Sequence, residues 1–227
     1  MDGPSRNQMA DAVSSLELKA TRKRSTRRGQ SAAVPVELAE VDAARAREYA
    51  LISALLARAP DAELLQRLAQ LPGDRSPLGR AHADLAQAAG RSHAAAVERE
   101  YFDLFVGLGR GELLPYASFY LTGSLHGHPL VRLRRDLAEL GLRRSPDVAE
   151  PEDHAAILCE LMSGLARRQW SAPPGTERAL FEAHLAPWIG HFFVDLEQGN
   201  AAQFYRSVGA LGRVYMAVEA EAFALPA

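Results

Sequence analysis

An aspartate and a histidine stand next to each other at residues 153 and 154, and both types can transfer protons or bind a charged group. Neighbouring side chains in a helix point about 100° apart, so Asp153 and His154 cannot easily bond to each other there. An acid in the first turn of a helix also complements the helix dipole, and a histidine there is expected to be neutral at pH 7. The pair can therefore be read as structural or as functional.

A second stretch that can carry chemistry is rich in glycine, proline and aromatic residues. Tyr116, Phe119 and Tyr120 gather around Pro115 and Ser118, directly after glycines at 107, 109 and 111. Loops are mostly polar and exposed, and they carry function more often than helices do. We expect these aromatic side chains either to enter the core or to present an adhesive surface.

The elements that must position these residues are predicted to be helices. Alanine and leucine dominate, whereas β-branched isoleucine and threonine, which favour strands, are scarce. Apolar residues recur at helical spacing in about nine or ten segments, and Asp61 and Ser76 are suited to cap two of them. We expect an all-α fold with a single globular bundle and a hinge near 143–150. Pro151 is expected to begin the next helix, and Pro187 to kink or split a later one.

The first residues differ in composition from the rest. Residues 1–36 are polar and include a run of lysine and arginine between Lys19 and Arg28 without an acid. This composition predicts that residues 1–36 form a disordered basic tail. Residues 37–227 are predicted to form a helical domain. The segment Thr26-Arg-Arg-Gly-Gln resembles a twin-arginine export element but lacks the apolar stretch that an export leader needs. A solvated tail is one interpretation; a tail that touches nucleic acid or acidic lipid, or imitates a client's leader, is another.

Several other classes of site are not favoured. The formal net charge is −2 and the isoelectric point about 6.4, so the chain as a whole is no polyanion binder. No apolar run is long enough to span a membrane, and Cys159 is expected to be a buried, inert thiol. The glycines at 107, 109 and 111 lack the spacing of a dinucleotide loop. His184 with His191, and His126 with His128, lack a third metal ligand, so we expect neither a metal nor a cofactor.

Together, the patterns Tyr-x-x-Leu-Phe-x-Gly followed by Pro-Tyr-x-Ser-x-Tyr, and Asp-His-x-x-x-Leu, resemble the TorD/DmsD family. Its members are cytoplasmic chaperones that mature molybdenum-containing redox enzymes. The resemblance spans residues 45–222 and implies a helical bundle that can form domain-swapped dimers. Leu114-Pro-Tyr stands where many members have Pro-Pro-Trp. The resemblance implies that the client's leader peptide binds at Pro115, Tyr116, Ser118, Tyr120, Asp153 and His154.

The resemblance thus implies a non-catalytic, cytoplasmic chaperone. It would bind the twin-arginine leader and apo form of a molybdoenzyme catalytic subunit, assist cofactor insertion, and delay export until folding is complete. It would not bind nucleic acid and would not insert stably into a membrane. It would act as a monomer or a domain-swapped homodimer. One alternative is a helical adaptor or assembly subunit of a respiratory complex. Another is a hydrolase or nucleotide-binding enzyme that uses Asp153 and His154.

Overall fold

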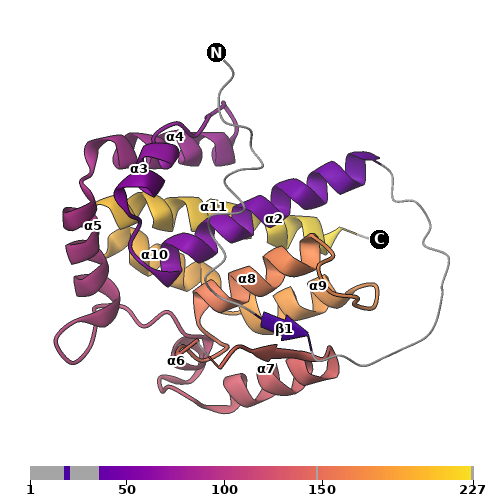
Figure 1. The fold of residues 1–227 in the computed structure, drawn as a ribbon. Coiled ribbons are helices and arrows are strands. Elements are labelled where there is room, and N and C mark those ends of the chain that lie inside the picture. Colours follow the sequence, from indigo (N-terminus) through magenta and orange to yellow (C-terminus); the bar gives the residue numbers. More distant parts are fainter. Residues whose placement is uncertain (1–17, 21–35, 147, 226–227) are drawn as a thin grey trace.

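The structure, a computed structural model, describes residues 18–20, 36–146 and 148–225. These residues form a helical bundle with one small pair of strands, which confirms the predicted fold class (Figure 1). The elements in chain order are β1 (Leu18–Ala20), α2 (Val36–Ala57), α3 (Ala62–Leu68), α4 (Pro77–Arg91), α5 (Ala94–Tyr101), the π-helix η1 (Phe102–Val106), α6 (Ala117–Thr122), α7 (His128–Glu139), β2 (Leu142–Arg144), α8 (Ala155–Ala166), α9 (Thr176–Leu180), the π-helix η2 (Phe181–Leu185), α10 (Ile189–Gln198) and α11 (Phe204–Ala224).

The two predicted helix caps are present. The Asp61 side chain accepts a hydrogen bond from the Leu64 N–H at 2.8 Å, and α3 begins at the next residue. The Ser76 hydroxyl accepts one from the Gly79 N–H at 2.9 Å at the start of α4. Pro77 is the first residue of α4, where a missing N–H leaves no helical hydrogen bond unmade.

The centre of the bundle is α8, which packs along α2. Every residue of α8 except Glu160 is buried, including Cys159, as expected for a helix that is apolar on all sides. α10 packs along α11, and α11 also contacts α4 and α2. The core therefore draws side chains from both halves of the chain, from Tyr49 of α2 to Tyr215 of α11.

A two-stranded antiparallel ladder lies beside α7 in Figure 1, and it pairs β1 with β2. Leu18 is in register with Arg144, and Ala20 with Leu142. Three residues of the predicted tail thus form a strand, and the rest of residues 1–35 lies outside the described residues. The hinge predicted near 143–150 begins within β2, where Arg143 and Arg144 are paired with β1, and continues into the segment after this strand; its motion stays a prediction.

Two predictions about helix limits are resolved. The segment after residue 175 is split at Pro187, because η2 ends at Leu185 and α10 starts at Ile189. Trp188, at the break, is buried, and its indole N–H donates to the His184 carbonyl at 2.7 Å. The prediction that Pro151 begins a helix is wrong, because α8 starts only at Ala155.

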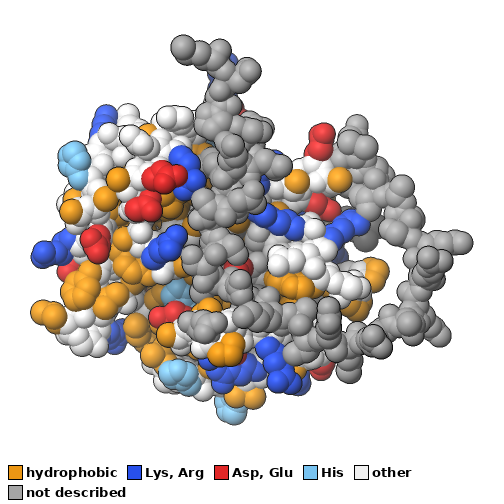
Figure 2. All heavy atoms as spheres, in the orientation of Figure 1, with side chains coloured by type: hydrophobic (Ala, Val, Ile, Leu, Met, Phe, Trp, Pro, Cys, Tyr) orange, Lys and Arg blue, Asp and Glu red, His pale blue; other side chains and the backbone are white. Residues whose placement is uncertain are grey.

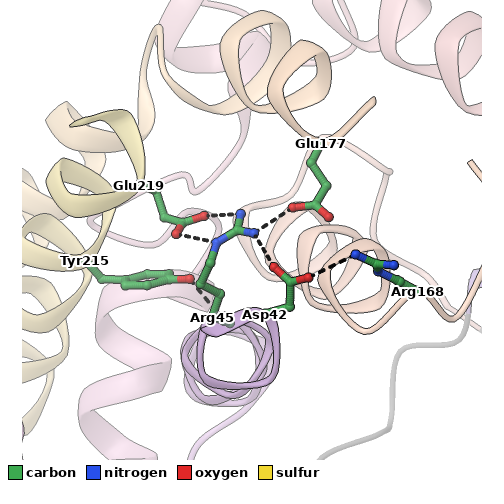
Figure 3. A network of polar contacts seen from close by, with 6 residues as sticks. All are labelled: Asp42, Arg45, Arg168, Glu177, Tyr215 and Glu219. Carbon is green, nitrogen blue, oxygen red and sulfur yellow. Dashed lines mark hydrogen bonds and ion pairs between the residues drawn. The ribbon is translucent and has the colours of Figure 1, made fainter. Parts of the chain in front are cut away.

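A network of charges joins α2 to the last helix (Figure 3). The Arg45 guanidinium donates two hydrogen bonds of 2.8 Å to the Glu219 carboxylate, which is 1% exposed. It also forms an ion pair of 2.9 Å with Glu177 of α9. Asp42 lies 3.4 Å from Arg45 and 3.4 Å from Arg168, which is in the turn after α8. The network links the helices α2, α9 and α11 with the turn that follows α8.

Candidate functional site

The glycine-rich stretch forms a tight loop that folds back along η1. Gly107 has a φ of 63°, and a Cβ atom there would lie 2.1 Å from the Arg110 carbonyl oxygen. The returning chain forms a backbone hydrogen bond of 2.8 Å from the Leu113 N–H to the Leu104 carbonyl. The turn therefore requires glycine at residue 107, and it delivers the chain to Pro115 from a fixed direction.

Two carboxylates fasten this region to the connection between α10 and α11. Glu112 accepts hydrogen bonds from the Asn200 N–H at 2.7 Å and the Ala201 N–H at 3.2 Å, and these bonds lower the pKa of its carboxyl group. Glu100, at the end of α5, accepts bonds from the backbone N–H groups of residues 203–205. The loop is thereby held at both ends against the C-terminal half of the bundle.

The two signature stretches meet through their backbones. Tyr116 and His154 form an isolated antiparallel bridge. The Ala155 N–H donates to the Pro115 carbonyl at 2.8 Å, and the Ala117 N–H donates to the Asp153 carbonyl at 3.0 Å. The structure thus brings Pro115, Tyr116, Asp153 and His154 together, which the sequence could not show.

Asp153 does not cap its own helix, contrary to the expectation for a first-turn acid. Its side chain is 1% exposed, and its Oδ2 accepts a hydrogen bond of 2.9 Å from the Ser118 N–H at the start of α6. Its Oδ1 is also buried and has no hydrogen-bond partner among the described residues. Asp153 therefore caps α6, which lies on the other side of the backbone bridge, and it fixes the beginning of that helix.

His154 precedes α8 as its cap residue, because the bridge to Tyr116 holds it in extended conformation with φ −67° and ψ 137°. Its Nδ1 accepts a hydrogen bond of 3.1 Å from the Ala156 N–H, so the neutral ring carries its proton on Nε2. Burial lowers its pKa to about 4, although the charges of Glu150 and Asp153 act in the opposite direction. The expectation of a neutral ring at pH 7 is confirmed, with burial as the main cause.

Ser118 and Tyr120 complete the set of predicted residues. Ser118 is fully buried, and its hydroxyl accepts a hydrogen bond of 3.3 Å from the His126 N–H, so it shapes the turn after α6. Tyr120 lies on α6, and its ring packs 5.5 Å from Trp188 and 6.0 Å from Phe192 between ring centres. Tyr120 is half-buried, so one part of it enters the core and another part faces out.

Two exposed carboxylates that the sequence did not single out lie at this site. The Tyr116 hydroxyl donates to Glu150 Oε2 at 2.6 Å, and the Tyr120 hydroxyl donates to Asp195 Oδ2 at 2.8 Å. Burial and these hydrogen bonds raise the pKa of both tyrosines. Glu150 stands close to the Asp-His pair in sequence, whereas Asp195 is on α10 and no local pattern marks it. Each tyrosine thus presents a ring beside an acceptor that keeps free lone pairs.

Apolar side chains are exposed on the segments that flank this site. They come from η1, the glycine loop, the end of α6 and the turn after α6: Phe102 (37% exposed), Val106 (50%), Leu108 (98%), Leu121 (42%) and Leu125 (40%). In Figure 2, hydrophobic side chains gather at the lower left, where Figure 1 places the loop that follows α5. The acidic and aromatic site therefore adjoins apolar surface.

The arrangement does not support an acid–base centre at Asp153 and His154. Both side chains are buried, and each already accepts a hydrogen bond from a backbone N–H. Among the described residues, no group of three or more His, Cys, Asp or Glu side chains could hold a metal ion. His184 bonds to Asp136 at 2.8 Å instead. In the same part of the chain, no helix is both long and apolar enough to cross a bilayer.

Comparison with known families identifies the class of protein. Residues 71–194, more than half of the chain, match the sequence model of the nitrate reductase delta subunit family, and the chain belongs to this family. The predicted TorD/DmsD resemblance is thereby confirmed.

Curated relatives carry the name chaperone protein TorD. The protein of that name from Vibrio cholerae is 29% identical over 126 residues, which cover 52% of this chain and 57% of that protein. The one from Shewanella pealeana is 24% identical over 207 residues, covering 82% of this chain and 92% of that protein. The chain thus spans little more than half the length of the first relative. The solved structure of a redox enzyme maturation protein from Archaeoglobus fulgidus aligns with a TM-score of 0.49 and 18% identity, covering 84% of this chain and 99% of that one.

Proposed function

We propose that the protein is a cytoplasmic chaperone that binds the apo form of a molybdenum-containing oxidoreductase subunit through its twin-arginine leader. It holds the subunit while the cofactor is inserted and delays export until folding is complete. Membership in the family and the names of the relatives support the chaperone class. The observation that supports the site most directly is the backbone bridge between Tyr116 and His154, which unites the two signature stretches.

In this proposal the arginines of the leader are recognised by the exposed acids Glu150 and Asp195. A guanidinium forms charge-assisted hydrogen bonds with a carboxylate and stacks on an aromatic face. Each of the two acids already accepts a hydrogen bond from a tyrosine, so ring and carboxylate are positioned together. The apolar part of the leader then covers the exposed side chains around Leu108. Asp153 and His154 act as positioning residues that hold Tyr116 and α6.

The test is the affinity of the full chain for a labelled peptide that carries two adjacent arginines followed by an apolar run. We expect Asp195→Asn and Glu150→Gln each to weaken binding about tenfold, which corresponds to about 1.4 kcal/mol. Tyr116→Ala weakens it further, because the ring and the hydrogen bond are both lost. Raising the salt concentration weakens binding in the wild type and less in the acid variants, because exposed charges are screened.

Asp84→Asn is the matched control for these variants, since Asp84 is an exposed acid on α4, away from the site. A peptide with both arginines replaced by lysine tests for the planar, bidentate contact. If the Asp195→Asn and Glu150→Gln variants bind the peptide as tightly as the Asp84→Asn variant does, the two acids do not recognise the arginines. If wild type binds no leader-like peptide, the proposed function fails as a whole.

A second candidate is a helical assembly subunit that stays in a respiratory enzyme, and the name of the family, nitrate reductase delta subunit, favours it. The two functions differ in the fate of the protein. A chaperone is captured with an unprocessed oxidoreductase subunit and is absent from the mature enzyme. A subunit is retained in the mature enzyme in stoichiometric amount, as mass spectrometry of the purified enzyme would show.

A further inference from the structure

A cavity of about 460 Å³ lies between α2, α3 and α4. These helices occupy the upper part of Figure 1, whereas α6 and the candidate leader site lie in the lower part. Apolar side chains from all three elements form much of its wall, namely Leu51, Leu64, Leu71, Pro72 and Leu78. Its volume is within the range of pockets that hold small organic molecules, about 300–1,000 Å³.

Two arginines line this cavity without adequate partners. The guanidinium of Arg47, on α2, has no hydrogen bond or ion pair with any described residue. Arg67 of α3 has a buried Nε with no hydrogen-bond partner among those residues. Its only ion pair there is a distant one, 3.9 Å from the largely exposed Glu63. A buried N–H without an acceptor is costly, so an acceptor supplied by a ligand would stabilise Arg67.

The acids that line the same cavity are already engaged. Glu48 lies 3.0 Å from His82 Nε2, and this hydrogen bond raises the pKa of His82. Asp74 accepts a hydrogen bond of 2.7 Å from the Ser76 N–H just before α4. Both carboxylates are thus held by partners other than Arg47 and Arg67, which leaves the donors of the two guanidinium groups available to a ligand.

We propose that this cavity is a binding site for a small amphipathic anion, an apolar chain or ring that carries one carboxylate or phosphate group. The anionic group lies between Arg47 and Arg67, and the apolar part covers the leucines of α2, α3 and α4. Arginine suits both headgroups because its donors match two oxygens at once. The cavity is lined by residues of α2, α3 and α4 and of the connections between them, none of which belongs to the proposed leader site, so the two sites are separate.

The test is to measure the affinity of the full chain for sodium decanoate and for decyl phosphate by isothermal titration calorimetry. Decanol and decyltrimethylammonium serve as neutral and cationic probes of equal chain length. We expect the anions to bind at least tenfold more tightly than the other two probes. Arg47→Met and Arg67→Met should each weaken anion binding about tenfold or more, because methionine keeps the apolar stem and removes the charge. Preference between the two anions identifies the headgroup.

Arg58→Met is the matched control, because Arg58 is an exposed arginine just past the end of α2 that does not line the cavity. Ala50→Phe adds bulk to the cavity wall and should abolish binding of every probe, with the helical circular dichroism signal unchanged. Equal binding of decanoate and decanol, or equal losses in Arg47→Met and Arg58→Met, overturns the proposal. Leader-peptide affinity should be unchanged in all of these variants, so this test and that of the proposed function can fail separately.

Discussion

At the residue scale, His154 makes the stability of the fold sensitive to acid. Its pKa is lowered by burial from 6.5 to about 4 in the folded chain. The unfolded chain therefore takes up a proton as the pH falls below 6.5, while the folded chain does not until about pH 4. Stability contributed by the neutral ring is complete above pH 6.5 and is lost progressively below it.

We predict that His154→Asn removes this part of the acid sensitivity. Asparagine is a good cap residue and can accept the Ala156 N–H, but it does not titrate. Between pH 7.5 and pH 5, wild type should lose about 2 kcal/mol more of its free energy of unfolding than the variant loses. Urea unfolding of both proteins at the two pH values measures the difference. Equal losses would mean that His154 is protonated as easily in the folded chain as in the unfolded one.

The residues of the candidate site were predictable where the signal is local. Pro115, Tyr116 and the Asp153-His154 pair stand in short patterns, and the structure brings them together. The acids that hydrogen-bond to the tyrosines were missed, because Glu150 is 34 residues away from Tyr116 in sequence and Asp195 is 75 residues away from Tyr120. An exposed acid on a helix is ordinary until its neighbour in space is known.

At the element scale, the start of α11 depends on a carboxylate from α5. Glu100 is 8% exposed and accepts three backbone hydrogen bonds, from Gln203 at 2.8 Å, Phe204 at 3.1 Å and Tyr205 at 2.7 Å. The first N–H groups of a helix have no partner within it, and a negative charge there also complements the helix dipole. Glu100 thus caps a helix that begins more than 100 residues later.

We predict that Glu100→Ala lowers the free energy of unfolding by about 3 kcal/mol, because it leaves buried N–H groups without an acceptor. Glu100→Gln should cost less, since its amide oxygen still accepts but carries no charge. Glu98→Ala is the control, an exposed glutamate on the same helix. Chemical denaturation of the three variants measures the effect. A cost in Glu100→Ala no larger than that in Glu98→Ala would show that water replaces the carboxylate at α11.

Element limits could be predicted from sequence wherever local chemistry sets them. Asp61, and Ser76 followed by Pro77, mark helix starts that the structure confirms. The start of α8 was misplaced at Pro151, because the backbone bridge to Tyr116 holds residue 154 in an extended conformation. That bridge is a tertiary contact between chain segments far apart in sequence, and no window of neighbouring residues contains it.

At the scale of the whole molecule, the Arg45 network ties the first long helix to the last. The guanidinium donates to both oxygens of Glu219, which is buried, and also faces Glu177. Burial alone would lower the pKa of Arg45, but its acidic partners raise it above the ordinary value. A paired buried charge adds modest net stability, whereas a buried charge left alone is strongly destabilising. In the folded chain, the network therefore leaves neither Arg45 nor Glu219 as an unpaired charge.

We predict that Arg45→Met lowers the free energy of unfolding by about 3–5 kcal/mol, because Glu219 is left buried and unpaired. The double variant Arg45→Met with Glu219→Met should recover most of that loss, since no charge is then left in the core. Arg213→Met is the control: Arg213 pairs with Glu197 at 2.8 Å between α11 and α10, but both side chains are partly exposed. That pair should contribute less than about 1 kcal/mol. Urea unfolding of the single, double and control variants measures the free energy of unfolding of each. If the double variant is as unstable as Arg45→Met, the loss comes from packing and not from the unpaired charge of Glu219.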